Sequence, residues 1–112
     1  MQKLVSTLCE QALSRMREAI RAGRYQVDDR DKNIRTLSQL GIVWRDALDE
    51  VLELTKDNYY EGPLVDYQNE NSDMYWVFKK VVSEKPIYIK FKIIYEQDGT
   101  LYLKSFHIDE RP

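Results

Sequence analysis

The sequence predicts a single α+β domain in which helices come first and an antiparallel sheet follows. Two patterns point to this class. Apolar residues recur at helical spacing in the first half and alternate with polar ones in the second half. The pair Asp98-Gly99 adds a strong hairpin signal between two alternating segments. Residues 1–55 are expected to be mainly helical and residues 74–108 to form the sheet. The chain of 112 residues is long enough for one hydrophobic core. We therefore expect helices packed on one face of a three-stranded antiparallel sheet.

Three helices are predicted in the first half. The first covers residues 4–20 and stops near Gly23, and its apolar positions recur every three or four residues: Leu4, Leu8, Ala12, Leu13, Met16 and Ile20. The second covers residues 33–40 and is ended by Gly41. The third covers about residues 45–54, with its apolar residues on one side. The polar residues 26–32 between the first two helices are expected to form a connection. Turn formation and helix capping explain their aspartates better than a metal site does.

Three strands are predicted in the second half, at residues 74–82, 87–95 and 101–108. Residues 59–73 are expected to form a loop, because Gly62-Pro63 interrupts the periodic pattern and a polar stretch follows. Trp76 is expected in the core.

The two hairpin turns predict which side chains share a face of the sheet. A two-residue turn at Asp98-Gly99 places Lys90 opposite His107, and a turn centred on residues 84–85 places Lys79 opposite Lys90. One face then carries polar and basic side chains: Lys79, Tyr88, Lys90, Lys92, Ser105 and His107. The opposite face carries apolar ones that would pack on the helices: Trp76, Phe78, Ile89, Phe91, Ile93 and Phe106.

Charge is distributed unevenly along the chain. The net charge is −2, yet residues 76–112 hold seven basic and five acidic side chains, whereas residues 1–75 hold ten and 14. A basic patch on an acidic protein can still bind a polyanion, because counterion release depends on local phosphate contacts. A solvated strand face is the simpler reading of the charges alone. With one cysteine, Cys9, no internal disulfide is possible. No membrane span or secretion signal is apparent, so we expect a cytoplasmic protein.

The residues of the polar face suggest one chemistry. Histidine and tyrosine can exchange protons with a ribose hydroxyl, and lysine can stabilise a phosphate oxygen that gains negative charge. These groups suit RNA cleavage by the 2′-hydroxyl without a metal ion or cofactor. The simpler readings are that a lone histidine near the C-terminus is a surface residue, and that a strand tyrosine reflects β-propensity.

Several segments together resemble the MqsR family of bacterial toxins, which are ribonucleases with a RelE-like fold. They are Ala22-Gly23, Leu40-Gly41-Ile42, Leu54 through Asp57-Asn58-Tyr59-Tyr60, Trp76 with the basic strand after it, Ile87-Tyr88-Ile89-Lys90, and Ser105-Phe106-His107. They follow the family's order over roughly residues 15–108.

The resemblance implies an mRNA-cleaving toxin of a type II toxin–antitoxin system, neutralised by a cognate antitoxin. Tyr88 matches a tyrosine of the family's active site. His107 stands where members often have a catalytic lysine. Two positions depart from the family: Glu61 replaces a lysine and Val77 replaces a glutamine.

We therefore expect His107, Tyr88 and Lys90 to be catalytic. The residues expected to bind RNA are Lys79, Lys80, Lys92, Ser105 and Tyr60. Two other functions remain open: a non-catalytic RNA-binding module that uses the basic face, and a protein-interaction domain that never contacts RNA.

Overall fold

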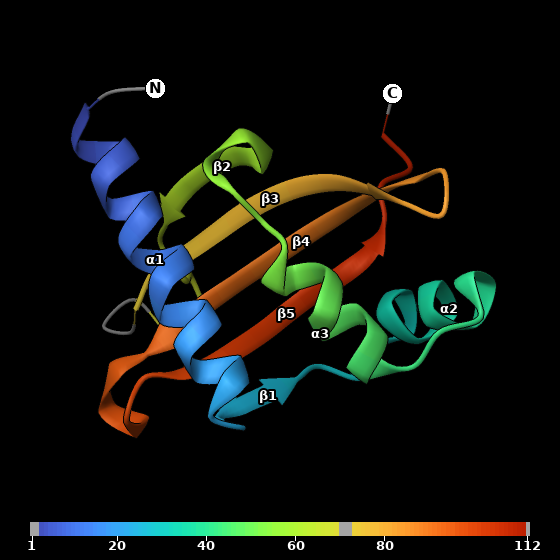
Figure 1. Cartoon of the computed structure of the whole chain (residues 1–112), viewed down its shortest axis with the longest axis horizontal. Helices are drawn as coiled ribbons and strands as arrows, with labels where there is room; N and C mark the ends of the chain where they lie inside the picture. The colour runs from blue at the N-terminus through green and yellow to red at the C-terminus, as the bar shows by residue number, and fades with distance from the viewer. Residues whose placement is uncertain (1–2, 70–72, 112) are drawn as a thin grey trace.

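A computed structural model describes residues 3–69 and 73–111 of the chain (Figure 1). The three predicted helices are confirmed, and the elements in chain order are α1 (Lys3–Arg21), β1 (Tyr25–Val27), α2 (Asp31–Leu40), α3 (Trp44–Leu52), η1 (Lys56–Asn58), β2 (Tyr59–Leu64), β3 (Tyr75–Val82), β4 (Lys85–Ile94), η2 (Tyr95–Gln97) and β5 (Thr100–Ile108). Among the described helices, none is long and apolar enough to cross a membrane.

The prediction of a three-stranded antiparallel sheet is wrong, because the sheet has five strands and is mixed. Its strand order is β1-β5-β4-β3-β2, and β1 runs parallel to β5 while the other pairs are antiparallel. Both additional strands lie at edges and give weak sequence signals. β1 has three largely exposed residues. β2 contains Gly62-Pro63 and pairs irregularly with β3, as edge strands tolerate.

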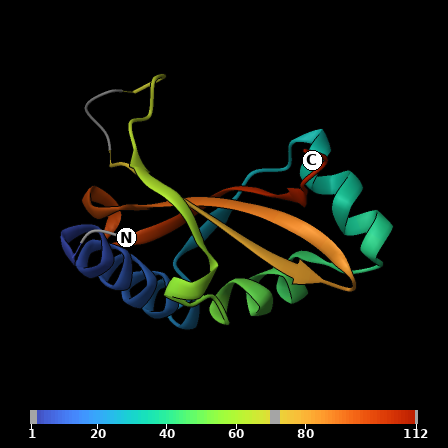
Figure 2. The same ribbon diagram turned by 90° about the horizontal axis from the view of Figure 1, so that it is seen from above.

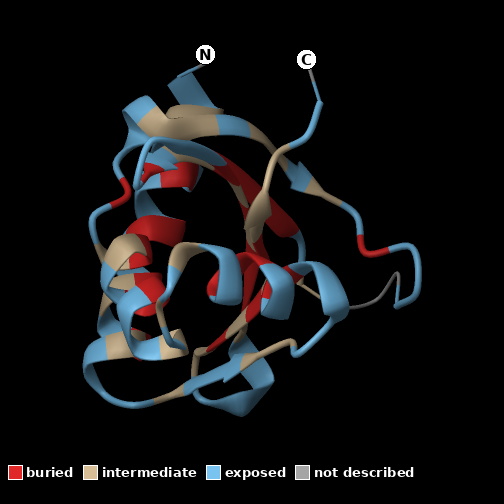
Figure 3. Ribbon diagram, turned by 90° about the vertical axis from the view of Figure 1, so that its right-hand side faces the viewer, coloured by how far each residue is buried: buried red, intermediate tan, exposed pale blue. Residues whose placement is uncertain are grey.

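The helices α1 and α3 cover one face of the sheet (Figures 1 and 2). The core between them and the strands is apolar, and its largest fully buried side chains include Phe78, Phe91, Phe106 and Met16. Trp76 is 7% exposed and belongs to this core, as predicted. In Figure 2 the segment after β2 and the start of α2 lie on the other side of the sheet, at opposite ends. Figure 3 shows the exposed outer surfaces of the helices and the buried strand segments behind them.

Helix α2 takes over the edge of β5 where β1 ends. β1 pairs with residues 101–103. Among the described residues, the later part of β5 therefore has no strand on the edge that faces away from β4. Two buried side chains of α2 supply the partners instead. Asn33 donates to the Lys104 carbonyl at 3.0 Å and accepts from the Phe106 N–H at 3.0 Å, and Thr36 accepts from the Ile108 N–H at 2.9 Å. These bonds satisfy a strand edge that would otherwise be open.

Both hairpins differ from the predicted register by two residues at the site. Tyr88 lies opposite His107, Lys90 lies opposite Ser105, and Lys79 lies opposite Tyr88. The first turn consists of Ser83 and Glu84, both with positive φ, and the second connection spans residues 95–99. Because side chains alternate with a period of two, a shift of two keeps every side chain on its predicted face.

Candidate functional site

A groove of about 790 Å³ lies between α2 and the face of the sheet opposite α1 and α3. Four of the expected site residues line it together: Tyr88, Lys90, Ser105 and His107. Six basic side chains line it, against two acidic ones, Asp109 and Glu110. The basic ones are Arg30, Lys32, Arg35, Lys90, Lys104 and Arg111. A concave surface with this excess of positive charge suits a polyanion.

Tyr88 and His107 form a stacked pair in the groove. They are direct cross-strand neighbours, with ring centroids 5.2 Å apart and ring planes 15° apart. Nδ1 of His107 lies 3.1 Å from the Ile108 carbonyl oxygen. Because a carbonyl only accepts, Nδ1 carries the proton in this contact, and Nε2 of a neutral imidazole keeps its lone pair. Stacking and this bond orient His107 as a proton acceptor.

The Tyr88 hydroxyl is held in its neutral form. Burial is the main cause that raises its pKa above the ordinary tyrosine value, and the charges of Glu61 and Asp109 add to this, while Arg111 and Lys79 act against it. A neutral phenol donates a hydrogen bond at physiological pH. Tyr88 is therefore suited to donate to a phosphate oxygen rather than to accept a proton.

Lys90 and Lys104 are neighbouring cations of the groove. Neither has an ion pair within the part of the chain that the structure describes. The pKa of Lys90 is lowered, first by burial and then by the charge of Lys104, with Arg30 adding to the repulsion. Like charges held together in this way are stabilised when an anion lies between them.

A β-bulge lets Lys104 share this face with Ser105. Lys90 pairs with Ser105, but the next residue of β4, Phe91, pairs with Leu103, so Lys104 has no partner in the ladder. Alternation counted back from Phe106 would turn Lys104 toward the helices, whereas alternation counted forward from Leu103 turns it toward the groove. A bulge lets two consecutive side chains, Lys104 and Ser105, face the groove.

A second group of charges lies beside the groove around Asp109. Its carboxylate pairs with Lys79 at 2.8 Å and with Arg111 at 3.1 Å, and its side chain is 7% exposed. The hydrogen bond from Lys79 lowers the pKa of Asp109 to about 2. Lys79 also lies 3.8 Å from the ring centre of Tyr60, which is 48% exposed. The expected RNA-binding residues Lys79 and Tyr60 thus contact each other, and Asp109 neutralises Lys79.

The remaining two expected RNA-binding lysines hold the fold together. Lys92 is 8% exposed and bonds the buried Asp66 carboxylate at 2.9 Å, which ties the segment after β2 to the sheet. Lys80 lies 3.3 Å from Glu50 and 3.1 Å from Glu53, on the side of α3. Neither lysine lines the groove.

The adjacent tyrosines Tyr59 and Tyr60 have different roles. Tyr59 packs edge-on against Trp76 and Phe78 and donates to the Gly62 carbonyl at 2.6 Å, so it anchors β2. Trp44 packs against the core, and its indole N–H donates to Asp29 at 2.9 Å.

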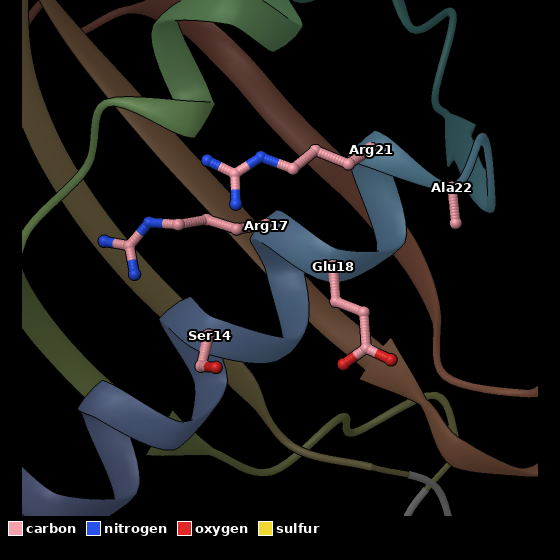
Figure 4. A pocket seen from close by; sticks show the side chains of 5 residues that line it. All are labelled: Ser14, Arg17, Glu18, Arg21 and Ala22. Carbon is pink, nitrogen blue, oxygen red and sulfur yellow. The ribbon is translucent and has the colours of Figure 1, made fainter.

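Two other features show structural roles. Cys9 is fully buried, and burial raises its pKa, so its thiol is inert. A second depression, of about 590 Å³, lies on the outer side of α1 and is lined by Ser14, Arg17, Glu18, Arg21 and Ala22 (Figure 4). There Arg17 donates to the carbonyl of Leu54 at 2.7 Å.

Within residues 3–69 and 73–111, no three His, Cys, Asp or Glu side chains are placed to hold a metal ion.

Sequence reasoning missed most of the groove's cations. Arg30 precedes α2, and Lys32 and Arg35 belong to this helix, which was not expected to adjoin the polar face. Lys104 was missed because bulges have no reliable sequence signal. Arg111 lies beyond the last predicted strand.

Comparison with known proteins adds no assignment: no protein-family model matches the chain, and a search of curated proteins finds no significant match.

Proposed function

We propose that this protein is an endoribonuclease that cleaves single-stranded mRNA through the 2′-hydroxyl of its substrate. The observation that carries the proposal is the stacked Tyr88–His107 pair inside a groove with six basic side chains. The pair offers an oriented proton acceptor beside a neutral hydroxyl donor. The basic side chains offer binding sites for the phosphates on either side of a cleaved bond.

In the proposed reaction, Nε2 of His107 accepts the proton of the 2′-hydroxyl. The 2′-oxygen forms a bond to the adjacent phosphorus, and the bond from phosphorus to the 5′-oxygen breaks. The imidazolium then returns its proton to the departing 5′-oxygen. The products are a 2′,3′-cyclic phosphate and a 5′-hydroxyl. Because the substrate supplies its own nucleophile, this chemistry requires no activated water.

Tyr88 and Lys90 act on the phosphate in this scheme. The phosphate gains negative charge as the new bond forms, and preorganised donors stabilise that charge. Tyr88 donates its hydroxyl hydrogen bond, and Lys90 supplies a cation. The attacking oxygen, phosphorus and leaving oxygen must be in line, so the nucleotide cannot keep the stacked geometry of a duplex. This requirement favours a single-stranded substrate.

The biological setting that we propose rests on the resemblance to MqsR toxins. The protein would act on mRNA in the cytoplasm of a bacterium and would be neutralised by a cognate antitoxin protein. The basic groove supports an RNA substrate but does not bear on the antitoxin. Growth arrest with loss of transcripts after induction of this chain alone supports the toxin role, and normal growth at verified expression contradicts it.

The enzymatic proposal is tested with His107→Gln in single-turnover cleavage of a short RNA. Removing a general acid–base group should lower the rate about 10²–10⁴-fold. RNA affinity and melting temperature should change little, since the imidazole is partly exposed, stacks on Tyr88 and bonds a neighbouring carbonyl. RNA that binds the groove and is not cleaved by the wild-type protein would favour the non-catalytic binding module. RNA that does not bind at all would favour the protein-interaction domain.

A further inference from the structure

Three lysine ammonium groups gather around one aromatic ring at the end of the groove. Nζ of Lys90, Lys92 and Lys104 lies 4.9, 5.0 and 5.0 Å from the ring centre of Tyr75. Among the described residues, the Asp66 carboxylate bonds Lys92 of this group at 2.9 Å. Lys90 and Lys104 therefore keep two positive charges that no described carboxylate pairs with.

Arg30 adds a third cation on the α2 side of the same cluster. It precedes α2, lines the groove, and is close enough to contribute to the lowered pKa of Lys90. Its contact with Asp28 is long, at 3.5 Å, and Asp28 also accepts the Tyr102 hydroxyl at 2.6 Å. Asp28 thus offsets Arg30 only in part.

The fold itself holds Lys104 in this cluster. The bulge lets Lys104 and Ser105 face the groove together between the buried Leu103 and Phe106. The buried amide of Asn33 bonds the Lys104 carbonyl and the Phe106 N–H, two backbone groups on either side of the bulge. A repulsive arrangement that the backbone is built to hold is expected where an anion binds.

The cluster lies one step along β4 from the proposed catalytic pair. Tyr88 and Lys90 are two residues apart on the same face, which is about 7 Å along a strand. The sugar between two consecutive phosphates of an extended strand can bridge such a distance. A phosphate at Lys104 and Arg30 can therefore belong to the nucleotide next to the one at Tyr88 and His107.

We propose that Lys104 and Arg30 bind the phosphate that adjoins the scissile one, with Lys90 between the two phosphates, so that the preferred substrate is a single-stranded RNA of at least three nucleotides. The inference rests on the proposed ribonuclease function for the identity of the scissile phosphate. The existence of a phosphate site beside Tyr75 does not depend on cleavage.

The first experiment measures binding of a short single-stranded RNA with 2′-O-methyl groups, which cannot cleave itself, as a function of salt. Lys104→Met removes one charge and keeps the length of the side chain. The slope of log affinity against log salt should fall by about 0.7, the value for one phosphate contact in a single strand. Lys56→Met is the matched control, because Lys56 is exposed and pairs with Glu10 of α1 on the helix-covered side. An unchanged slope for Lys104→Met, or an equal fall for Lys56→Met, overturns the inference.

The second experiment compares cleavage of a dinucleoside monophosphate with that of a trinucleoside diphosphate. The wild-type protein should cleave the trinucleotide about tenfold faster, since it gains a hydrogen bond between charged groups. Lys104→Met should lose this preference, so that its ratio of trinucleotide to dinucleotide cleavage rates falls to about one. Equal wild-type rates on both substrates overturn the inference but leave the ribonuclease function standing. If neither RNA is cleaved, the ribonuclease function fails, and the salt slope still decides on the phosphate site.

Discussion

Asn33 joins α2 to β5, and its removal should be costly for stability. Its amide is fully buried and makes three hydrogen bonds to backbone groups: to the carbonyls of Asp28 at 2.8 Å and Lys104 at 3.0 Å, and from the N–H of Phe106 at 3.0 Å. Asn33→Ala leaves all three backbone groups without this partner. A buried group that loses its partner costs about 1–3 kcal/mol.

The expected loss of unfolding free energy for Asn33→Ala is about 2–4 kcal/mol. Two of the bonds are only partly buried, so water can replace them in part, whereas the Phe106 N–H is buried. Urea unfolding followed by the fluorescence of Trp44 and Trp76 measures the change, and the melting temperature should fall by about 10 °C. Ser38→Ala, at an exposed position of α2, is the control and should change stability by less than about 0.5 kcal/mol. A loss below 1 kcal/mol for Asn33→Ala would refute the claim that the amide holds the edge of β5.

Asn33→Asp separates the hydrogen bonds from the volume of the side chain. Its carboxylate can still accept from Phe106, but its second oxygen faces two carbonyls that also only accept. Burial raises the pKa of a carboxyl, so the native state binds the proton more tightly than the unfolded state does. Stability of this variant should therefore fall as pH rises from about 4 to 7, relative to the wild-type protein. A pH-independent difference between the two proteins would contradict the burial of this site.

Two further predictions concern the ion pairs that surround the groove. Lys92→Met should lower the free energy of unfolding in urea by about 3–5 kcal/mol, because it leaves the buried Asp66 carboxylate without its lysine. It should leave the salt slope of RNA binding unchanged. A reduced slope at intact stability would show that Lys92 binds RNA after all. Asp109→Asn should remove stability that the wild-type protein has above pH 4 and loses as pH falls toward 2, because the folded-state pKa of Asp109, about 2, lies below its unfolded value. The same variant should bind RNA more tightly, and equal stability curves for the two proteins between pH 2 and 6 would contradict the Lys79 ion pair.

The predicted face of the sheet was correct because side-chain alternation does not depend on the exact register. The predicted turns placed Lys90 opposite His107, and the structure places Tyr88 there instead. A shift of two residues changes each cross-strand partner and leaves the face unchanged. In the second hairpin the five-residue connection after β4 shifts the register by three, and the bulge at Lys104 takes back one residue. In the first hairpin the shift arises because the turn begins at Ser83. Positive φ at Asp98 and Gly99 was a sound expectation, but the turn they belong to is longer than two residues.

The basic residues in and near the groove differ in their ion-pair partners, and a sequence does not specify those partners. Lys90 and Lys92 lie on the same face of β4. Lys92 has an ion pair with the buried Asp66 carboxylate, whereas Lys90 has no ion pair with a described carboxylate. Asp66 comes from a segment that was expected to be a loop, so its ion pair with Lys92 could not be predicted. Lys80 was expected to bind RNA, but it pairs with Glu50 of α3 and with Glu53 just after it.

The groove and the fold depend on the same few backbone hydrogen bonds. β1 is too short to cover β5, so α2 must complete the edge, and Asn33 does so where the bulge breaks the ladder. The same position of α2 brings Arg30 to the groove, and the same bulge lets Lys104 and Ser105 face it together. A variant at Asn33 should therefore weaken RNA binding even where the protein remains folded, whereas a variant at Lys104 should weaken binding without loss of stability. Stability and affinity measured together on both variants distinguish a residue that builds the site from one that contacts the ligand.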